Sequence, residues 1–170
     1  MAIILFLYAF VSNAALAVVP HEPIVIWYGP RLGVWTTALV ATAGTVAASW
    51  MDHRVFSGHV AALWARSQRD WSAGWLGWAS RGFARVPFAM VAASGLTPLP
   101  FFPFKVMAFA VRYPRGRYLA AVATGRLPRY LLLAWLGASL RLPTWPFVLA
   151  CALFLLPTLR GFRWHRQSVN

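Results

Sequence analysis

Five long apolar stretches dominate this sequence and restrict what the chain can fold into. They cover residues 2–19, 32–51, 86–111, 118–140 and 143–159. Hydrophobic types make up 60% of the 170 residues and charged types only 11%, against roughly 25% charged residues in soluble domains. A soluble domain of this length would leave much of that apolar area in water. We therefore predict an all-α membrane protein in which residues 1–170 form a single transmembrane domain.

Four of the stretches are long enough to span a bilayer, because a spanning helix needs roughly 20 apolar residues and about 17 suffice. These are 2–19, 32–51, 118–140 and 143–159. The stretch 86–111 is interrupted by Pro98, Pro100 and Pro103, which remove backbone donors and force turns. Broken backbone at membrane depth is tolerated only when protein or a water-filled cavity surrounds it. We expect residues 86–111 to form a re-entrant hairpin that enters and leaves on one side.

A second re-entrant element is predicted at about residues 20–30. Pro20 and Pro23 flank His21 and Glu22 between the first two predicted spans. An ordinary surface turn with an exposed carboxylate is an equally good interpretation of this segment. The two elements would act as hinges, with Pro20, Pro23, Pro98, Pro100 and Pro103 as the hinge residues.

The basic residues form clusters between the apolar stretches. Fifteen are arginines, Lys105 is the only lysine, and the net charge is +13. The clusters are Arg54, Arg66, Arg69, Arg81 and Arg85, then Arg112, Arg115 and Arg117, then Arg160, Arg163 and Arg166 in a basic tail over residues 160–170. The positive-inside rule places all three in the cytoplasm, with both termini, and predicts a multi-pass protein of the plasma membrane. Their positions favour anionic lipid headgroups rather than nucleic acid as partners.

An amphipathic arm is predicted over residues 57–82. Val60, Trp64, Trp71, Trp75 and Trp78 share one helical face in this segment. Such a helix is typical of the bilayer interface, with tryptophan at the headgroup level.

Two arginines interrupt the apolar stretch 118–140. Arg126 lies nine residues after Arg117, which is roughly 13 Å along a helix and near mid-membrane. Burying arginine there costs at least about 2.5 kcal/mol, so such residues are functional by default. Arg129 lies on the same side at i+3. The alternative is a helix that begins near Leu127, with both arginines at the interface.

The remaining charges near apolar stretches are few. Glu22 is the only glutamate in the chain, and Asp52 follows the second stretch beside Arg54. We interpret Asp52 as an interfacial charge paired with Arg54. The compact ammonium group of Lys105 would suit a carboxylate or a phosphate.

The two halves of the chain share a weak pattern. Residues 39–45 have the sequence L-V-A-T-A-G-T, and residues 120–126 have A-A-V-A-T-G-R. Gly44 follows Pro20 by 24 residues and Gly125 follows Pro100 by 25. This layout is compatible with an inverted repeat, in which two broken elements meet at mid-membrane to form a transport site.

These motifs resemble those of a known family, the DedA-like, SNARE-associated (VTT-domain) membrane proteins, in particular their small prokaryotic members. The matching motifs are Thr97-Pro98-Leu99-Pro100, Pro103-Phe104-Lys105, Gly125-Arg126, Arg129-Tyr130 and Pro20-His21-Glu22. The resemblance covers roughly residues 12–140. The chain departs from the family pattern at Ser12 and Asn13, where members usually carry a further acid.

The resemblance implies a lipid transporter that flips or scrambles phospholipids or polyprenyl phosphates. In that interpretation Arg126, Arg129 and Lys105 hold the phosphate, and Glu22 and Asp52 are the candidates for proton coupling. No cofactor or metal is expected, and a homo-oligomer is compatible with the small size of the chain.

Two other classes of function remain open at this point. One is a structural membrane protein that organises the envelope without transport. The other is a membrane-embedded enzyme, which is disfavoured because the sequence has no H-E-x-x-H motif and Cys151 has no evident base nearby.

Overall fold

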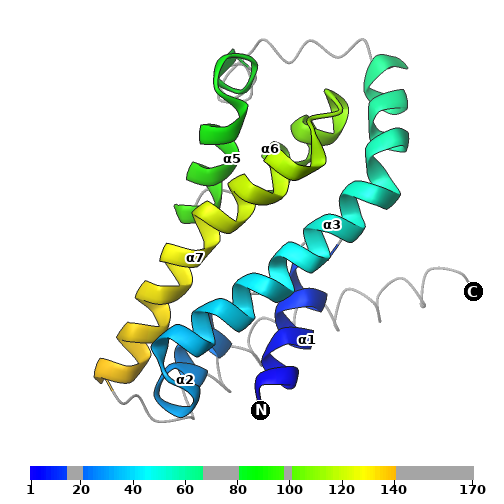
Figure 1. The fold of residues 1–170 in the computed structure, drawn as a ribbon. Helices are drawn as coiled ribbons and strands as arrows, with labels where there is room; N and C mark the ends of the chain where they lie inside the picture. Colours follow the sequence, from blue (N-terminus) through cyan, green and yellow to red (C-terminus); the bar gives the residue numbers. More distant parts are fainter. Residues whose placement is uncertain (15–20, 67–80, 98–100, 141–170) are drawn as a thin grey trace, which may run out of the picture.

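The computed structural model describes residues 1–14, 21–66, 81–97 and 101–140, and this part of the chain is helical. Residues 81–85 form a short helical segment just before α5. The labelled helices are α1 (Ala2–Asn13), α2 (Glu22–Leu32), α3 (Val34–Arg66), α5 (Pro87–Leu96), α6 (Phe101–Ala110) and α7 (Arg115–Leu140) (Figure 1).

The predicted membrane architecture is wrong for the part of the chain that the structure describes. None of its helices combines the length and the apolar character that crossing a bilayer requires. This finding overturns the spans 2–19, 32–51 and 118–140, and with them the multi-pass fold, the re-entrant elements and the plasma-membrane localisation. The fifth predicted span, 143–159, and the basic tail lie outside the described residues.

The physical reason why a predicted span is wrong differs from helix to helix. The helix in the first stretch, α1, has only 12 residues. The second and fourth stretches form long helices, but these carry polar side chains along their buried faces. In α3 and α7 the buried polar residues are Thr37, Thr42, Thr45, Ser49, Asp52, His53 and Arg126.

Helix α1 ends where side chains compete for its last carbonyls. Ser12 Oγ and Asn13 Nδ2 both donate to the carbonyl of Ala9, at 3.2 and 2.8 Å. Ala14 is then extended, with ψ of 148°. Such local side-chain bonds offer the backbone an alternative to continuing the helix.

The segment predicted as a second re-entrant element forms one helix. Helix α2 begins at Glu22 and has Pro23 in its first turn, a position where the missing N–H of proline costs no hydrogen bond. Pro23 therefore starts a helix rather than breaking one. Pro20 lies outside the described residues.

The stretch 86–111 forms two helices. Helix α5 ends at Leu96, and Thr97 is extended with ψ of 164°. Helix α6 begins at Phe101 with Pro103 in its first turn. The other two prolines of this segment, Pro98 and Pro100, lie outside the described residues.

The predicted arm over residues 57–82 does not begin as a separate helix. Residues 57–66 continue α3, which is 33 residues long and extends from Val34 to Arg66. Residues 81 and 82 belong to the short helical segment before α5. Residues 67–80, with three of the tryptophans that defined the arm, lie outside the described part.

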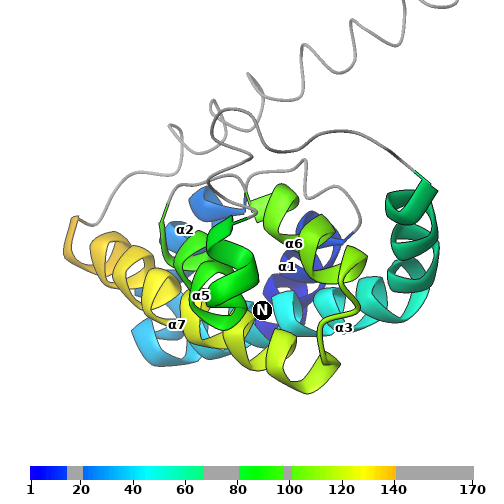
Figure 2. The same cartoon turned by 90° about the horizontal axis from the view of Figure 1, so that it is seen from above.

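The two long helices, α3 and α7, lie side by side in opposite directions and form the frame of the molecule (Figure 1). Each half of the chain then adds two short helices. Helix α1 packs on α3 and α5 packs on α7, within their own halves, whereas α2 packs on α7 and α6 packs on α3. Figure 2 shows the short helices gathered on one side of the α3–α7 pair. The two halves are therefore interlocked.

Glycines allow these helices to approach closely. A Cβ atom on Gly44 would lie 2.6 Å from the carbonyl oxygen of Phe6 in α1. A Cβ on Gly125 of α7 would overlap the carbonyl of Ala92 in α5, and Gly29 and Gly137 have equally close neighbours between α2 and α7. Small residues permit such backbone contact between helices.

Replacement of Gly125 by alanine should therefore destabilise the fold. The new methyl group would force α5 away from α7, at a cost of about 1–3 kcal/mol in the free energy of unfolding. Gly58 provides the control, because it lies within α3 and a Cβ there meets nothing within 4 Å among the described residues. Gly58→Ala should stabilise the protein by about 0.5–1 kcal/mol. Denaturant unfolding of both variants checks this, and equal stabilisation by both would contradict the close α5–α7 contact.

Candidate anion-binding site

Arg126 lies at the centre of the polar interior. It projects from the middle of α7 and is only 4% exposed. Its Nη1 lies 3.3 Å from His21 Nε2, and its Cζ lies 5.0 Å from the centroid of the Phe101 ring. Its Nε is buried and has no hydrogen-bond partner within the described residues. Because α7 begins at Arg115 and Arg126 is buried, the alternative of a helix that begins near Leu127 is wrong.

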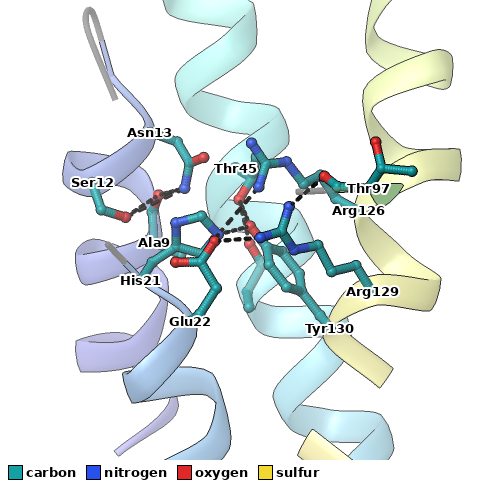
Figure 3. A network of polar contacts seen from close by, with 11 residues as sticks. Ala9, Ser12, Asn13, His21, Glu22, Thr45, Thr97, Arg126, Arg129 and Tyr130 are labelled. Carbon is teal, nitrogen blue, oxygen red and sulfur yellow. Dashed lines mark hydrogen bonds and ion pairs between the residues drawn. The ribbon is translucent and has the colours of Figure 1, made fainter. Parts of the chain in front are cut away.

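Arg129, one turn further along α7, has two acceptors. Its Nη2 donates to Glu22 Oε1 at 2.7 Å, and its Nη1 donates to the backbone carbonyl of Thr97 at 3.0 Å (Figure 3). The side chains of Arg129 and Glu22 are partly exposed, at 20% and 29%. This ion pair ties the start of α2 and the end of α5 to α7.

Lys105 forms a second, deeper ion pair. Its Nζ donates to Asp52 Oδ2 and, at 3.3 Å, to the backbone carbonyl of Asn13. Both charged side chains are buried, so this pair joins α6 and α3 to the end of α1. The interpretation of Asp52 as an interfacial charge is wrong, because Asp52 is fully buried.

The charges of this interior do not balance. Glu22 pairs with Arg129 and Asp52 pairs with Lys105. The chain has three acidic residues in all, and the third, Asp70, lies outside the described residues. Within the described part, the guanidinium of Arg126 therefore has no carboxylate partner. One buried positive charge is left over between two ion pairs.

Three further residues complete the network: His21, Tyr130 and Thr45. None of them was predicted from the sequence as a site residue. His21 and Tyr130 are buried, and Tyr130 Oη lies 2.6 Å from His21 Nε2 and 2.9 Å from Thr45 Oγ1 (Figure 3). The available signals were weak. Tyr130 lies four residues after Arg126, on the same face of a helix, and His21 precedes Glu22.

Burial and the arginines control protonation in the site. Burial lowers the pKa of His21 from 6.5 to about 4; Glu22 opposes this, and Arg126 and Arg129 add to it. Burial alone would raise the pKa of Glu22, but His21, a hydrogen bond from its own backbone, Arg129 and Arg126 together hold that pKa below its ordinary value. Burial raises the pKa of Tyr130, which keeps its hydroxyl protonated. At neutral pH the site therefore holds a neutral imidazole, a carboxylate and a phenol.

The arrangement offers donors rather than metal ligands. No group of three or more histidine, cysteine, aspartate or glutamate side chains that would suit a metal ion occurs in the described part of the chain. Two of the predicted phosphate-binding residues are ion-paired with the predicted proton-coupling residues: Arg129 with Glu22, and Lys105 with Asp52.

Comparison with known proteins identified no relatives. No family model matches the chain, and no curated protein and no solved structure matches it either. The resemblance to DedA-like proteins thus stays a prediction from the motifs.

The buried Lys105–Asp52 pair gives a first prediction for this site. Asp52→Asn should destabilise the protein by about 3–5 kcal/mol, because it leaves a buried ammonium without its counter-charge. The double variant Asp52→Asn/Lys105→Met should recover most of that loss, since it removes both charges together. Denaturant unfolding of the single and double variants measures the coupling. Additive losses would show that the two residues do not depend on each other.

The lowered pKa of His21 gives a pH dependence. Between pH 6.5 and about 4 the unfolded chain binds more protons at this residue than the folded chain, so stability falls as the pH is lowered through this window. The loss should reach roughly 3 kcal/mol at pH 4. His21→Gln, which does not titrate, should remove this contribution from the pH profile of unfolding. Parallel pH profiles of unfolding for wild type and His21→Gln would contradict the lowered pKa of His21.

Proposed function

We propose that this protein binds the phosphate group of a lipid at Arg126, with Arg129 beside it. One observation carries the proposal: the guanidinium of Arg126 is buried, its Nε has no partner, and it forms no ion pair with a carboxylate of the described residues. An unpaired buried charge costs several kcal/mol. A bound anion would supply the missing counter-charge and the missing acceptor.

Phosphate suits this site because a guanidinium presents its N–H groups as a planar fork that two phosphate oxygens accept together. Arg129 is partly exposed and already holds Glu22. A phosphate on Arg126 would compete with the Glu22 carboxylate for Arg129. Lys105 is buried against Asp52, and burial together with the charge of Arg126 lowers the pKa of Lys105.

A lipid is favoured as the source of the phosphate because apolar side chains are exposed on the same helices. In α1 and α7 these are Ile3, Ile4, Leu7, Val11, Leu132, Trp135, Leu136 and Leu140. Exposed apolar surface of this extent commonly marks a binding surface. A polar interior between helices with apolar outer faces suits a ligand that has a charged headgroup and hydrocarbon chains.

Movement of the bound lipid stays a prediction from the family resemblance. That prediction comprises flipping or scrambling, and proton coupling through Glu22 or Asp52. A purely organising role, the alternative from the sequence, would also use exposed apolar faces. The unpaired Arg126 favours ligand binding, because organisation alone does not require a buried charge.

Binding of labelled lipids tests the proposal. We expect wild type to bind a fluorescent phosphatidylglycerol or polyprenyl phosphate, and not a diacylglycerol with the same label. Arg126→Gln should weaken phosphate-lipid binding by about tenfold or more, because it removes a charged hydrogen-bond donor. Arg117→Gln is the matched control, since Arg117 lies in the same helix and is exposed; it should bind like wild type.

Two further results would distinguish a lipid phosphate from free phosphate as the ligand, and phosphate binding from an organising role. Displacement of the lipid by inorganic phosphate alone, at equal concentration, would show that the phosphate is recognised without its chains. Equal binding of diacylglycerol, or undiminished binding by Arg126→Gln, would reject the phosphate site and leave the organising role.

A further inference from the structure

His21 contacts the guanidinium of Arg126 at Nη1, a different nitrogen from the unpartnered Nε. It caps the N-terminus of α2 and is 6% exposed. Its Nε2 lies within hydrogen-bonding distance of Arg126 Nη1, at 3.3 Å, and of Tyr130 Oη, at 2.6 Å. One ring nitrogen is thus shared by two partners from α7.

The hydrogen-bonding capacity of these partners determines which nitrogen of the His21 ring carries the proton. A guanidinium has only donors, so Nε2 must accept from Arg126. Nε2 therefore carries no proton, and the ring is the neutral tautomer with its proton on Nδ1. The lowered pKa of His21 agrees with a neutral ring.

This tautomer determines the direction of the hydrogen bond between Tyr130 and His21. Tyr130 donates its single hydroxyl proton to Nε2, which it shares as an acceptor with Arg126. The Thr45 hydroxyl, 2.9 Å from Tyr130 Oη, can give its own single proton either to Tyr130 or to the Ala41 carbonyl at 3.0 Å. The His21 and Tyr130 rings meet edge to face, with centroids 5.3 Å apart. His21 is thus held by contacts from α7, and through Tyr130 from α3.

Charged groups surround the ring on other sides. Glu22 Oε1 lies 4.0 Å from Nε2, and Arg126 and Arg129 both act on the His21 charge. A cationic His21 would therefore be attracted by Glu22 but repelled by two arginines, and its Nε2 proton would point at the donor Nη1 of Arg126. Neutrality of the ring is a condition for the observed geometry.

We propose that His21 is the positioning residue of the anion site: it accepts from Arg126 Nη1 and thereby turns the Nε side of the guanidinium toward the phosphate. This inference rests on the proposed function, because it assigns a role within the same site. Without the acceptor at position 21, the guanidinium would lose its orientation while keeping its charge.

Three variants test this role. Glutamine places a carbonyl oxygen near the position of Nε2 and can accept both hydrogen bonds, whereas leucine fills a similar volume without an acceptor. His21→Leu should weaken binding of the fluorescent phosphatidylglycerol by about tenfold, and His21→Gln should stay within about threefold of wild type. Tyr130→Phe, which keeps the Arg126 contact, should have a smaller effect than His21→Leu.

A spectroscopic measurement without ligand separates this inference from the proposed function. In protein labelled with nitrogen-15 at histidine and arginine, His21 Nε2 should give the signal of an unprotonated ring nitrogen at pH 7. The Arg126 Nε signal, assigned by its loss in Arg126→Gln, should shift in His21→Leu and return toward wild type in His21→Gln.

The outcomes are distinct. Equal binding by His21→Leu and wild type, equal weakening by Leu and Gln, or a protonated Nε2 at pH 7 would each overturn the positioning role. If wild type binds no phosphate lipid, the proposed function fails, and a Leu-specific shift of Arg126 Nε would show that His21 orients Arg126 for another purpose.

Discussion

The buried guanidinium of Arg126 is the constraint around which the rest of the interior is arranged. A charge removed from water must find acceptors or a counter-charge. Arg126 has one acceptor, His21, and the face of Phe101, and it lies between two ion pairs that are already complete. Among the described residues, His53 Nδ1, Tyr118 Oη and Arg126 Nε are buried without a hydrogen-bond partner. Of these three atoms, Arg126 Nε belongs to the network around the two ion pairs, and this supports the proposed anion site.

The helix ends supply what the charged side chains need. A helix leaves its last carbonyls without intrahelical partners, and two of the three cations of the candidate site use such a carbonyl. Lys105 donates to Asn13 at the end of α1, and Arg129 donates to Thr97 at the end of α5. The following helices, α2 and α6, then begin with Glu22 and Phe101, which contact Arg129 and Arg126. The ends of α1 and α5 and the starts of α2 and α6 thus contribute residues to the candidate site.

The predicted architecture was wrong, and the predicted roles of the site residues stay predictions. Arg126 and Arg129 were selected because they interrupt an apolar stretch, and Glu22, Asp52 and Lys105 because charges near apolar stretches are few; the structure pairs Arg129 with Glu22 and Lys105 with Asp52. The spanning helices were wrong because average hydropathy over a stretch does not show where a helix ends, as at Asn13, or that α3 buries Thr45 and Asp52 on one face. His21 was missed because a single histidine beside a proline has no pattern of its own.

By itself the sequence determined that the cations cannot all be paired, since 16 basic residues face three acidic ones. It also determined that helices would form and that the stretch 86–111, with its three prolines, would not be one continuous helix. Only the tertiary structure decided which cations are buried, and that among the described residues Arg126 is buried without an ion pair while Lys105 is paired. Asp52 reaches Lys105 across 53 residues, and Glu22 reaches Arg129 across 107. Such pairing depends on how α3 and α7 pack with the short helices, and local propensity and hydropathy carry no information on contacts so distant in the chain.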